Sequence, residues 1–311
     1  QMYTDFEDYG WSSGTYCQKV YQGYTTKIEK DVVISTWQSI YKMPRKYFEQ
    51  FGCVIGDEAH MFKAKSLTGI MTKLHQCKYR FGLTGTLDGS QTHKLVLEGL
   101  FGTAEKVVST KELIDKKTLA NLKIKCIVLK HPTKKERMDY VEEMDYIVSR
   151  ESRNKFILDL CKNISGNTLC LFQLVEKHGK ILHDGMKGGE NVYFVYGGTD
   201  TEQREKIRGL VEGHTKSTTI ASYGTFSTGI NIRNINNIVL ASPSKSKIRV
   251  LQSIGRGLRT SSTKDSILIF DIADDISYGE RRNFTLNHFF ERINIYNEEQ
   301  FNYEISKVKI K

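Results

Sequence analysis

Short runs of β-branched and aromatic residues recur along the chain, separated by longer amphipathic stretches. The strand-like runs are residues 31–36, 53–56, 79–84, 123–129, 168–172, 192–196, 217–222, 237–241 and 266–271. Between them, residues 153–164 after a Ser152 cap and residues 201–212 after a Thr199–Glu202 capping box are typical of helices. This alternation predicts an α/β fold, with parallel sheets flanked by helices on both faces.

The length of 311 residues is enough for two domains. A polar, lysine-rich stretch at 110–122 precedes a new strand, so we place the first domain at 1–118 and the second at 119–277. Residues 278–311 are rich in aromatic and charged side chains. They predict a C-terminal helical extension whose aromatic residues pack on the second sheet.

Composition narrows the class of protein. The net charge of +10 favours a polyanionic partner such as nucleic acid, although a solvated basic surface would give the same value.

The six cysteines form no C-x-x-C pair that would indicate zinc. Cys53, Cys126 and Cys170 lie in apolar runs, which predicts buried thiols in a reducing compartment such as the cytoplasm. No apolar window is long enough to span a membrane, and the first residues lack the basic start of a secretory signal.

The segment CVIGDEAH, residues 53–60, ends a strand-like run in two acids and a histidine. Ligands of open α/β sheets bind beyond the carboxyl ends of the strands. Asp57 is therefore placed to hold Mg²⁺, and Glu58 to orient and deprotonate a water molecule that attacks a phosphate. An exposed acidic turn would have the same four letters, so this motif alone leaves both interpretations open.

The segment QSIGRGLR, residues 252–259, places Gln252, Arg256 and Arg259 at helical spacing on one face. The planar guanidinium of arginine suits phosphate oxygens and stabilises charge that develops at a γ-phosphate. A solvated basic helix is the alternative. Gly255 and Gly257 count against it, because glycine weakens a helix unless something approaches closely.

Three further segments carry little weight singly. Residues 221–232, ASYGTFSTGINI, predict a strand that ends in a phosphate-binding turn. LTGT at 83–86 follows another strand, and STWQS at 35–39 contains Thr36, whose hydroxyl could bind a phosphate.

In this order, the five segments resemble motifs Ib, II, III, V and VI of superfamily 2 DEAH-type helicases. FG-x-VIGDEAH, YRFGLTGTLDG and SKSKIRVLQSIGRGLR are similar to the UvsW-type recombination helicases of T-even-like bacteriophages, and the similarity extends into ERINIYNEEQFNYEI at the end of the chain. The resemblance implies two RecA-like domains with ATP in the cleft between them, and a role in DNA recombination, repair and replication. For a phage-encoded protein, the compartment is the host cytoplasm.

The resemblance also implies roles for individual residues. Glu58 would activate water, Asp57 would bind Mg²⁺–ATP, and Arg256 and Arg259 would be the arginine fingers. The remaining roles fall into three groups: nucleotide binding for His60, Gly229, Asn231 and Gln252; coupling of hydrolysis to movement for Thr84, Gly85 and Thr86; and contact with the DNA backbone for Thr36 and Ser222. Asn231 departs from the aspartate that is frequent in the family, which puts its ribose contact in doubt.

A phosphate-binding loop, G-x-x-x-x-G-K-[ST], is absent from the sequence. The one Gly-Lys pair, Gly179–Lys180, has Leu174 where the first glycine belongs. In the family this loop lies upstream of the segment that Gln1 and Met2 resemble. We therefore expect a first domain truncated at its N-terminus and little ATPase activity from this chain alone.

The expected function of the longer protein is an ATP-dependent DNA helicase or translocase. Its expected substrates are branched or single-stranded DNA and RNA–DNA hybrids. Two alternatives stay open. One is the motor subunit of a restriction or repair complex, which would carry nearly the same motifs. The other is an ATP-independent nucleic-acid binding or annealing module, for which the positive charge is sufficient.

Overall fold

The computed structural model describes residues 2–21, 23–85, 87, 90–132, 138–229, 232, 234–244, 246–258 and 266–311, without the side chains of 227–229, 247, 248 and 256. The chain forms two compact units, residues 1–105 and 106–311. The sequence placed this boundary at 118. The difference arises because α7 (Thr110–Asp115), which has a Ser109–Glu112 capping box, contributes Ile114 to the core of unit 2.

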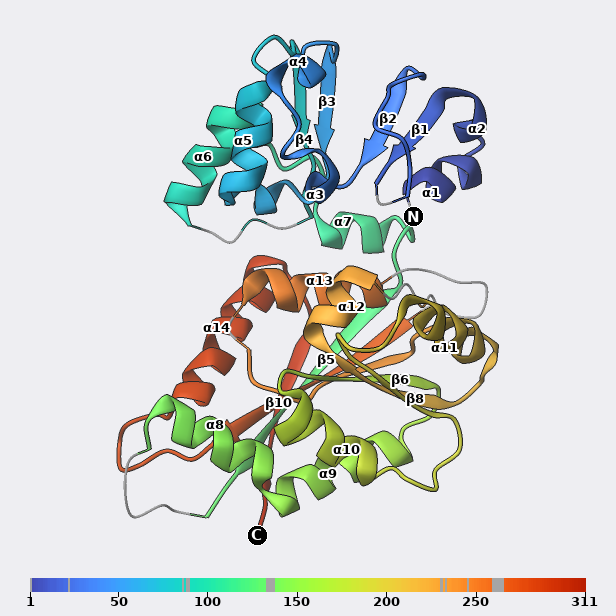
Figure 1. Ribbon diagram of the computed structural model, residues 1–311. Helices are drawn as coiled ribbons and strands as arrows, with labels where there is room; N and C mark the ends of the chain where they lie inside the picture. The colour runs from blue at the N-terminus through green and yellow to red at the C-terminus, as the bar shows by residue number, and fades with distance from the viewer. Residues whose placement is uncertain are drawn as a thin grey trace. The chain divides into compact units, whose positions relative to one another are not determined.

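Unit 1 contains two separate pairs of parallel strands (Figure 1). The first pair is β1 (Cys17–Val20) with β2 (Val32–Ser35), and the second is β3 (Cys53–Gly56) with β4 (Tyr79–Gly82). The helices are α1 (Met2–Asp8), α2 (Ser13–Tyr16), α3 (Trp37–Ile40), α4 (Arg45–Phe48), η1 (Ala59–Lys63), α5 (Lys65–Lys73) and α6 (Gln91–Phe101). The core of unit 1 lies between α4, η1, α5 and α6 and includes Phe48, Phe62 and Met71.

Unit 2 is built on a seven-stranded sheet in the order β11-β5-β10-β9-β6-β8-β7, and every pairing in it is parallel. The strands are β5 (Asn121–Lys130), β6 (Asn167–Phe172), β7 (Val192–Val195), β8 (Ser217–Ser222), β9 (Asn237–Leu240), β10 (Ser266–Asp275) and β11 (Tyr303–Lys309). The central strands β6, β8 and β9 are buried along their whole length, as expected of parallel strands covered on both faces.

Helices cover both faces of this sheet (Figure 1). One face packs against α11 (Thr201–Gly213), α12 (Tyr223–Gly229), α13 (Lys247–Gly257) and α14 (Phe284–Glu298). The other packs against α9 (Glu151–Asn163) and α10 (Lys180–Asp184). The remaining helices of unit 2 are α8 (Tyr140–Ser149) and η2 (Val175–Gly179). The α/β fold with a helix-flanked parallel sheet is therefore confirmed.

Several local predictions need correction. The cap of α9 is Arg150 rather than Ser152, and α11 is capped by Asp200, which accepts a hydrogen bond from the backbone N–H of Gln203. The tail is not wholly helical, because β11 follows α14 and pairs with β5. Cys53 is exposed, whereas Cys126 and Cys170 are buried as predicted. Cys53 starts a strand in a two-stranded sheet, and residue Ile55 on the same face is also exposed.

Candidate functional site

The carboxyl ends of β3 and β4 are joined by backbone hydrogen bonds that continue past the strands. The N–H of Leu83 donates to the carbonyl of Gly56, and the N–H of Ala59 donates to the carbonyl of Leu83, both at 2.8 Å. The final residues of the strands, Gly56 and Gly82, are paired in register. A Cβ atom at Gly56 would lie 2.8 Å from the ring of Phe62, so this position requires glycine. The DEAH segment and the described start of the LTGT segment therefore lie together at the carboxyl ends of β3 and β4.

Glu58 adopts the left-handed backbone conformation, with φ 49° and ψ 50°. Such a conformation costs a non-glycine residue about 1–2 kcal/mol. The Asp57 Oδ1 atom accepts a hydrogen bond of 2.9 Å from the Glu58 N–H, and Ala59 is anchored to Leu83. Strain held in place by its surroundings is characteristic of functional sites. The left-handed conformation of Glu58 turns the chain sharply after β3. The Glu58 side chain remains about half exposed.

His60 connects the two segments. Its Nδ1 atom lies 3.0 Å from the Thr84 hydroxyl and 3.2 Å from a carboxylate oxygen of Glu58. The imidazole is only 9% exposed, so its position is fixed by packing as well as by these two contacts. One ring nitrogen thus faces both the acid of one segment and the hydroxyl of the other.

The carboxylates suit a magnesium ion that is held mainly by a nucleotide. Within the described part of the chain, no group of three or more His, Cys, Asp or Glu residues is arranged to hold a metal. Mg²⁺ keeps several of its waters and commonly takes one or two carboxylates together with substrate phosphates. The exposed Asp57 at the end of β3 matches that donor set.

In unit 2, Gly229 lies on α12 and Gln252 and Arg256 lie on α13, and these two helices contact each other. Residues 223–229 form a helix rather than the predicted turn. Ser222 is 9% exposed, and its hydroxyl is 2.8 Å from that of Thr225, so this side chain fixes the start of α12. Gln252 and Arg256 lie on α13, which begins after Ser246, whose hydroxyl accepts from the Arg249 N–H.

Gly257 allows α13 to approach the sheet. A Cβ atom there would collide with Cδ1 of Ile267 and would lie 2.8 Å from Cδ1 of Ile238, whereas the space around Gly255 is open. Of the two glycines, only Gly257 is therefore closely approached by other atoms, as predicted. Those atoms belong to side chains of the sheet strands.

Some predicted residues cannot be compared with the structure. Thr86, Asn231 and Arg259 lie outside the described residues, and for Arg256 only the backbone is described. Gly229 ends α12, and Gly85 is exposed beyond β4. Thr36 precedes α3, and its hydroxyl lies 2.9 Å from that of Ser39.

A buried polar cluster at the carboxyl ends of β5, β9 and β10 was missed by the sequence reasoning. The Arg153 guanidinium donates to both carboxylate oxygens of Asp274, at 2.8 and 3.0 Å, and to the carbonyl of Ala241. His131 also contacts Asp274, and His178 Nδ1 lies 2.9 Å from the hydroxyl of Ser242. The cluster joins the ends of these three strands to α9 and η2.

The charges of this cluster shift two pKa values. Burial disfavours the charged form of Asp274, but Arg153 and His131 outweigh it and lower the pKa of Asp274 to about 2. Burial and the nearby Arg153 lower the pKa of His178 to about 3, so this imidazole is neutral at pH 7. The sequence signal for this cluster is Asp274, an acid within the apolar run SILIFDIADD. A buried carboxylate requires a partner, so this acid predicts one.

A second buried pair connects α14 to the segment before α13. The Arg292 guanidinium donates to both carboxylate oxygens of Asp271 and, at 2.9 Å, to the carbonyl of Ser244. The Tyr296 hydroxyl donates to the same carboxylate at 2.8 Å. The Tyr223 hydroxyl, at the start of α12, donates to the carbonyl of Ser242. The residues around the beginning of α13 are thus held by both α12 and α14.

The Gly179–Lys180 pair, which the sequence excludes as a phosphate-binding loop, lies where η2 passes into α10. A Cβ atom at Gly179 would lie 2.5 Å from the ring of Phe172, so tight packing explains this glycine. Lys180 makes an ion pair of 2.7 Å with Glu176. None of the described helices combines the length and apolar character required to cross a membrane.

Two family models match the chain. Residues 1–89 match the model described as type III restriction enzyme, res subunit, and residues 150–261 match the helicase conserved C-terminal domain. The first match covers the DEAH segment, and the second covers α12 and α13.

Two relatives match over most or all of the chain. The ATP-dependent DNA helicase uvsW of Enterobacteria phage T4 is 35% identical over 100% of this chain and 66% of its own length. The putative ATP-dependent helicase IRC3 of Saccharomyces cerevisiae is 25% identical over 81% of this chain and 38% of its own length. This chain therefore spans about two thirds of the phage relative and less of the yeast one.

Two solved structures show the same architecture. The crystal structure of T4 UvsW matches 99% of this chain and 65% of its own, with a TM-score of 0.53 and 34% identity. The fragment of a putative HsdR subunit of a type I restriction enzyme from Vibrio vulnificus matches 94% of this chain and 55% of its own, with a TM-score of 0.70. At 16% identity, the second match supports the fold alone.

Proposed function

Because this chain belongs to the superfamily 2 helicases and is of the UvsW type, we propose that the whole protein is an ATP-dependent DNA helicase or translocase. Its proposed substrates are branched recombination and replication intermediates and RNA–DNA hybrids. The observation that carries the proposal is the strained Glu58, held between Asp57 and the His60–Thr84 contact at the edge of a parallel sheet.

The roles of the residues follow from this geometry. Asp57 would hold Mg²⁺ together with the phosphates of ATP, and the ion would neutralise charge on the transferred phosphoryl group. The half-exposed Glu58 is placed to accept a proton from the attacking water. His60 and Thr84 link the position of that acid to the segment after β4, which is the proposed route of coupling.

Unit 2 supplies positive charge and helix ends. Nearly all of the surplus of Lys and Arg over Asp and Glu falls within residues 106–311. We assign Gln252, Gly229 and Asn231 to nucleotide binding, and Arg256 and Arg259 to stabilising the γ-phosphate. Since Ser222 uses its hydroxyl to fix α12, its proposed contact with the DNA backbone would have to be made by an atom other than that hydroxyl, or by the neighbouring residues of α12.

A second candidate function is the motor subunit of a restriction or repair complex. The match of residues 1–89 to the res subunit model favours it. Translocation on duplex DNA without strand separation would support this candidate. Unwinding of forked or branched DNA would support the first.

We further propose that the 311-residue chain alone hydrolyses ATP weakly, because its sequence contains no G-x-x-x-x-G-K-[ST] loop. A salt titration of DNA affinity with and without ATP tests this. The chain alone should show only the counterion-release slope of a basic binder, while a form that includes a phosphate-binding loop should show nucleotide-dependent affinity. Robust turnover by the chain alone would contradict the proposal.

A further inference from the structure

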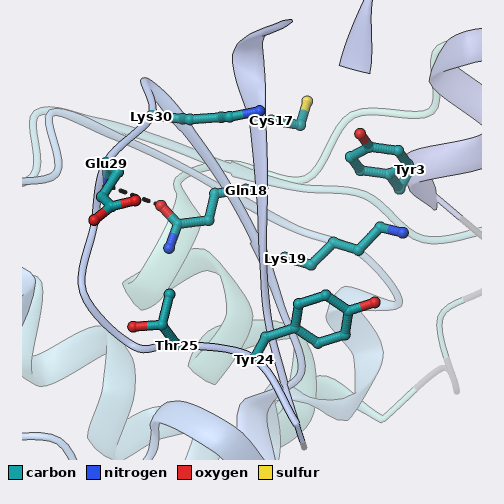
Figure 2. A pocket seen from close by; sticks show the side chains of 8 residues that line it. All are labelled: Tyr3, Cys17, Gln18, Lys19, Tyr24, Thr25, Glu29 and Lys30. Carbon is teal, nitrogen blue, oxygen red and sulfur yellow. Dashed lines mark hydrogen bonds between the residues drawn. The ribbon is translucent and has the colours of Figure 1, made fainter. Parts of the chain in front are cut away.

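Unit 1 contains a pocket that none of the helicase motifs accounts for. It has a volume of about 290 Å³ and is formed by α1, β1 and the segment between β1 and β2 (Figure 2). Its lining consists of Tyr3, Cys17, Gln18, Lys19, Tyr24, Thr25, Glu29 and Lys30. Two lysines and two tyrosines therefore border one cavity.

Side-chain hydrogen bonds, rather than backbone pairing between strands, hold the wall of the pocket in place. The Gln18 amide donates to the carbonyl of Lys27 at 2.5 Å and accepts from the Glu29 N–H at 2.8 Å. The Lys30 ammonium donates to the carbonyl of Gly14, which ties the same wall to α2. The hydrogen bonds of Gln18 and Lys30 thus fix the segment between β1 and β2 against β1 and α2.

Figure 2 shows the Lys19 side chain between the rings of Tyr3 and Tyr24. Its ammonium lies 4.1 Å from the Tyr3 ring centroid and 5.9 Å from that of Tyr24. No ion pair joins Lys19 to a carboxylate of the described residues. The carboxylate in the lining, Glu29, is paired with Lys27 at 3.2 Å. The positive charge of Lys19 is thus available to an anion.

Tyr24 supplies an accessible aromatic surface beside this charge. Its side chain is 50% exposed, and its ring contacts Tyr21 edge-on at 4.7 Å, which limits its movement. An exposed aromatic ring next to a cation is the combination that binds single-stranded nucleic acid, because bases stack on the ring while the backbone phosphates meet the charge.

We propose that this pocket binds one nucleotide of a single-stranded nucleic acid, with a phosphate at the Lys19 ammonium and the base against the Tyr24 ring. The proposal rests on the proposed nucleic-acid function and specifies the strand form that unit 1 recognises. Bases in a duplex are already stacked on their neighbours, so the pocket favours single strands over duplex.

The experiment measures binding of a fluorescent oligothymidylate to the 311-residue chain at low salt by anisotropy. Tyr24→Ala should weaken binding about tenfold, and Tyr24→Phe should retain it, because the ring is kept. Lys19→Met should weaken binding by a larger factor than Lys65→Met, an exposed lysine of α5 outside the lining that controls for the loss of charge alone.

An abasic oligonucleotide of the same length separates the two contacts. Its affinity should respond to Lys19→Met and not to Tyr24→Ala. Equal effects of Tyr24→Ala on the abasic and the normal strand would overturn the stacking contact. If free thymidine monophosphate bound as tightly as the strand, the assignment to a strand would be overturned in favour of a mononucleotide site.

Two negative results have different meanings. If the unmodified chain binds the oligonucleotide and the Lys19 and Tyr24 variants bind equally well, the pocket proposal fails and the proposed function is untouched. If the unmodified chain binds neither single-stranded nor duplex DNA at low salt, both the proposed nucleic-acid function and the pocket proposal are contradicted.

Discussion

His60 and Thr84, which are 24 positions apart in sequence, meet in a contact of 3.0 Å between imidazole Nδ1 and hydroxyl oxygen. The contact joins the loop after β3 to the loop after β4, and it places the histidine against Glu58 as well. Any movement of the segment after β4 must therefore act on the acid that is proposed to activate water.

Removing the Thr84 hydroxyl tests this link. Thr84→Val keeps the shape of the side chain but leaves His60 with one partner fewer, so the free energy of unfolding should fall by about 1 kcal/mol. In a form of the protein that includes a phosphate-binding loop, DNA should stimulate ATP turnover less. Thr84→Ser, which retains the hydroxyl, should behave nearly as the unmodified protein. Equal loss of stimulation in both variants would show that the hydroxyl is not the coupling group.

The two glycines of α13 should respond in opposite ways to alanine. Gly257→Ala inserts a methyl group against Ile267 and Ile238 and should cost about 1–2 kcal/mol, because overpacking exceeds the gain in helix propensity. Gly255→Ala enters open space and should stabilise by up to about 1 kcal/mol. Urea unfolding of the two variants measures both effects. Similar free energies would mean that α13 does not approach the sheet as closely as described.

His178 should make the stability of unit 2 depend on pH. Its pKa is lowered from 6.5 to about 3 in the folded state, so the unfolded chain binds a proton first as the pH falls. The stability that the neutral imidazole contributes is complete above about pH 6.5 and is lost on acidification toward pH 3, by at most about 1.4 kcal/mol per pH unit.

Urea midpoints between pH 7 and pH 4 measure this slope. His178→Gln should flatten it, while substitution of the exposed His75 in unit 1 should leave it unchanged. A slope that persists in His178→Gln would assign the pH dependence to another group.

The nine strand-like runs singled out in the sequence all form strands, because central strands of a parallel sheet are apolar throughout and leave a clear signal. Strand β1 was missed, since two of its four residues, Gln18 and Lys19, are polar. Strand β11 was missed as well. It lies at the edge of the sheet, Ile305 in it is 49% exposed, and its pairing with β5 joins residues far apart in sequence. The residue pattern within β11 does not indicate that β5 is the strand with which it pairs.

The sequence predicted those parts of the candidate site whose residues come shortly after a strand. Asp57, Glu58 and Thr84 come directly after strands, so their meeting at one edge follows from parallel pairing. The left-handed backbone of Glu58 and the burial of the Ser222 hydroxyl depend on tertiary contacts. The partners of Asp271 and Asp274 come from α14 and α9, which no spacing rule connects to β10.

The measurement that tests the central claim most directly is DNA-stimulated ATP hydrolysis by Glu58→Gln in a form of the protein that includes a phosphate-binding loop. The amide keeps the shape and the hydrogen-bonding capacity of the side chain but cannot accept the proton of the attacking water. We expect turnover to fall by at least about a hundredfold while the affinity for DNA is unchanged. Turnover equal to that of the unmodified protein would contradict the assignment of Glu58 and, with it, the motor function.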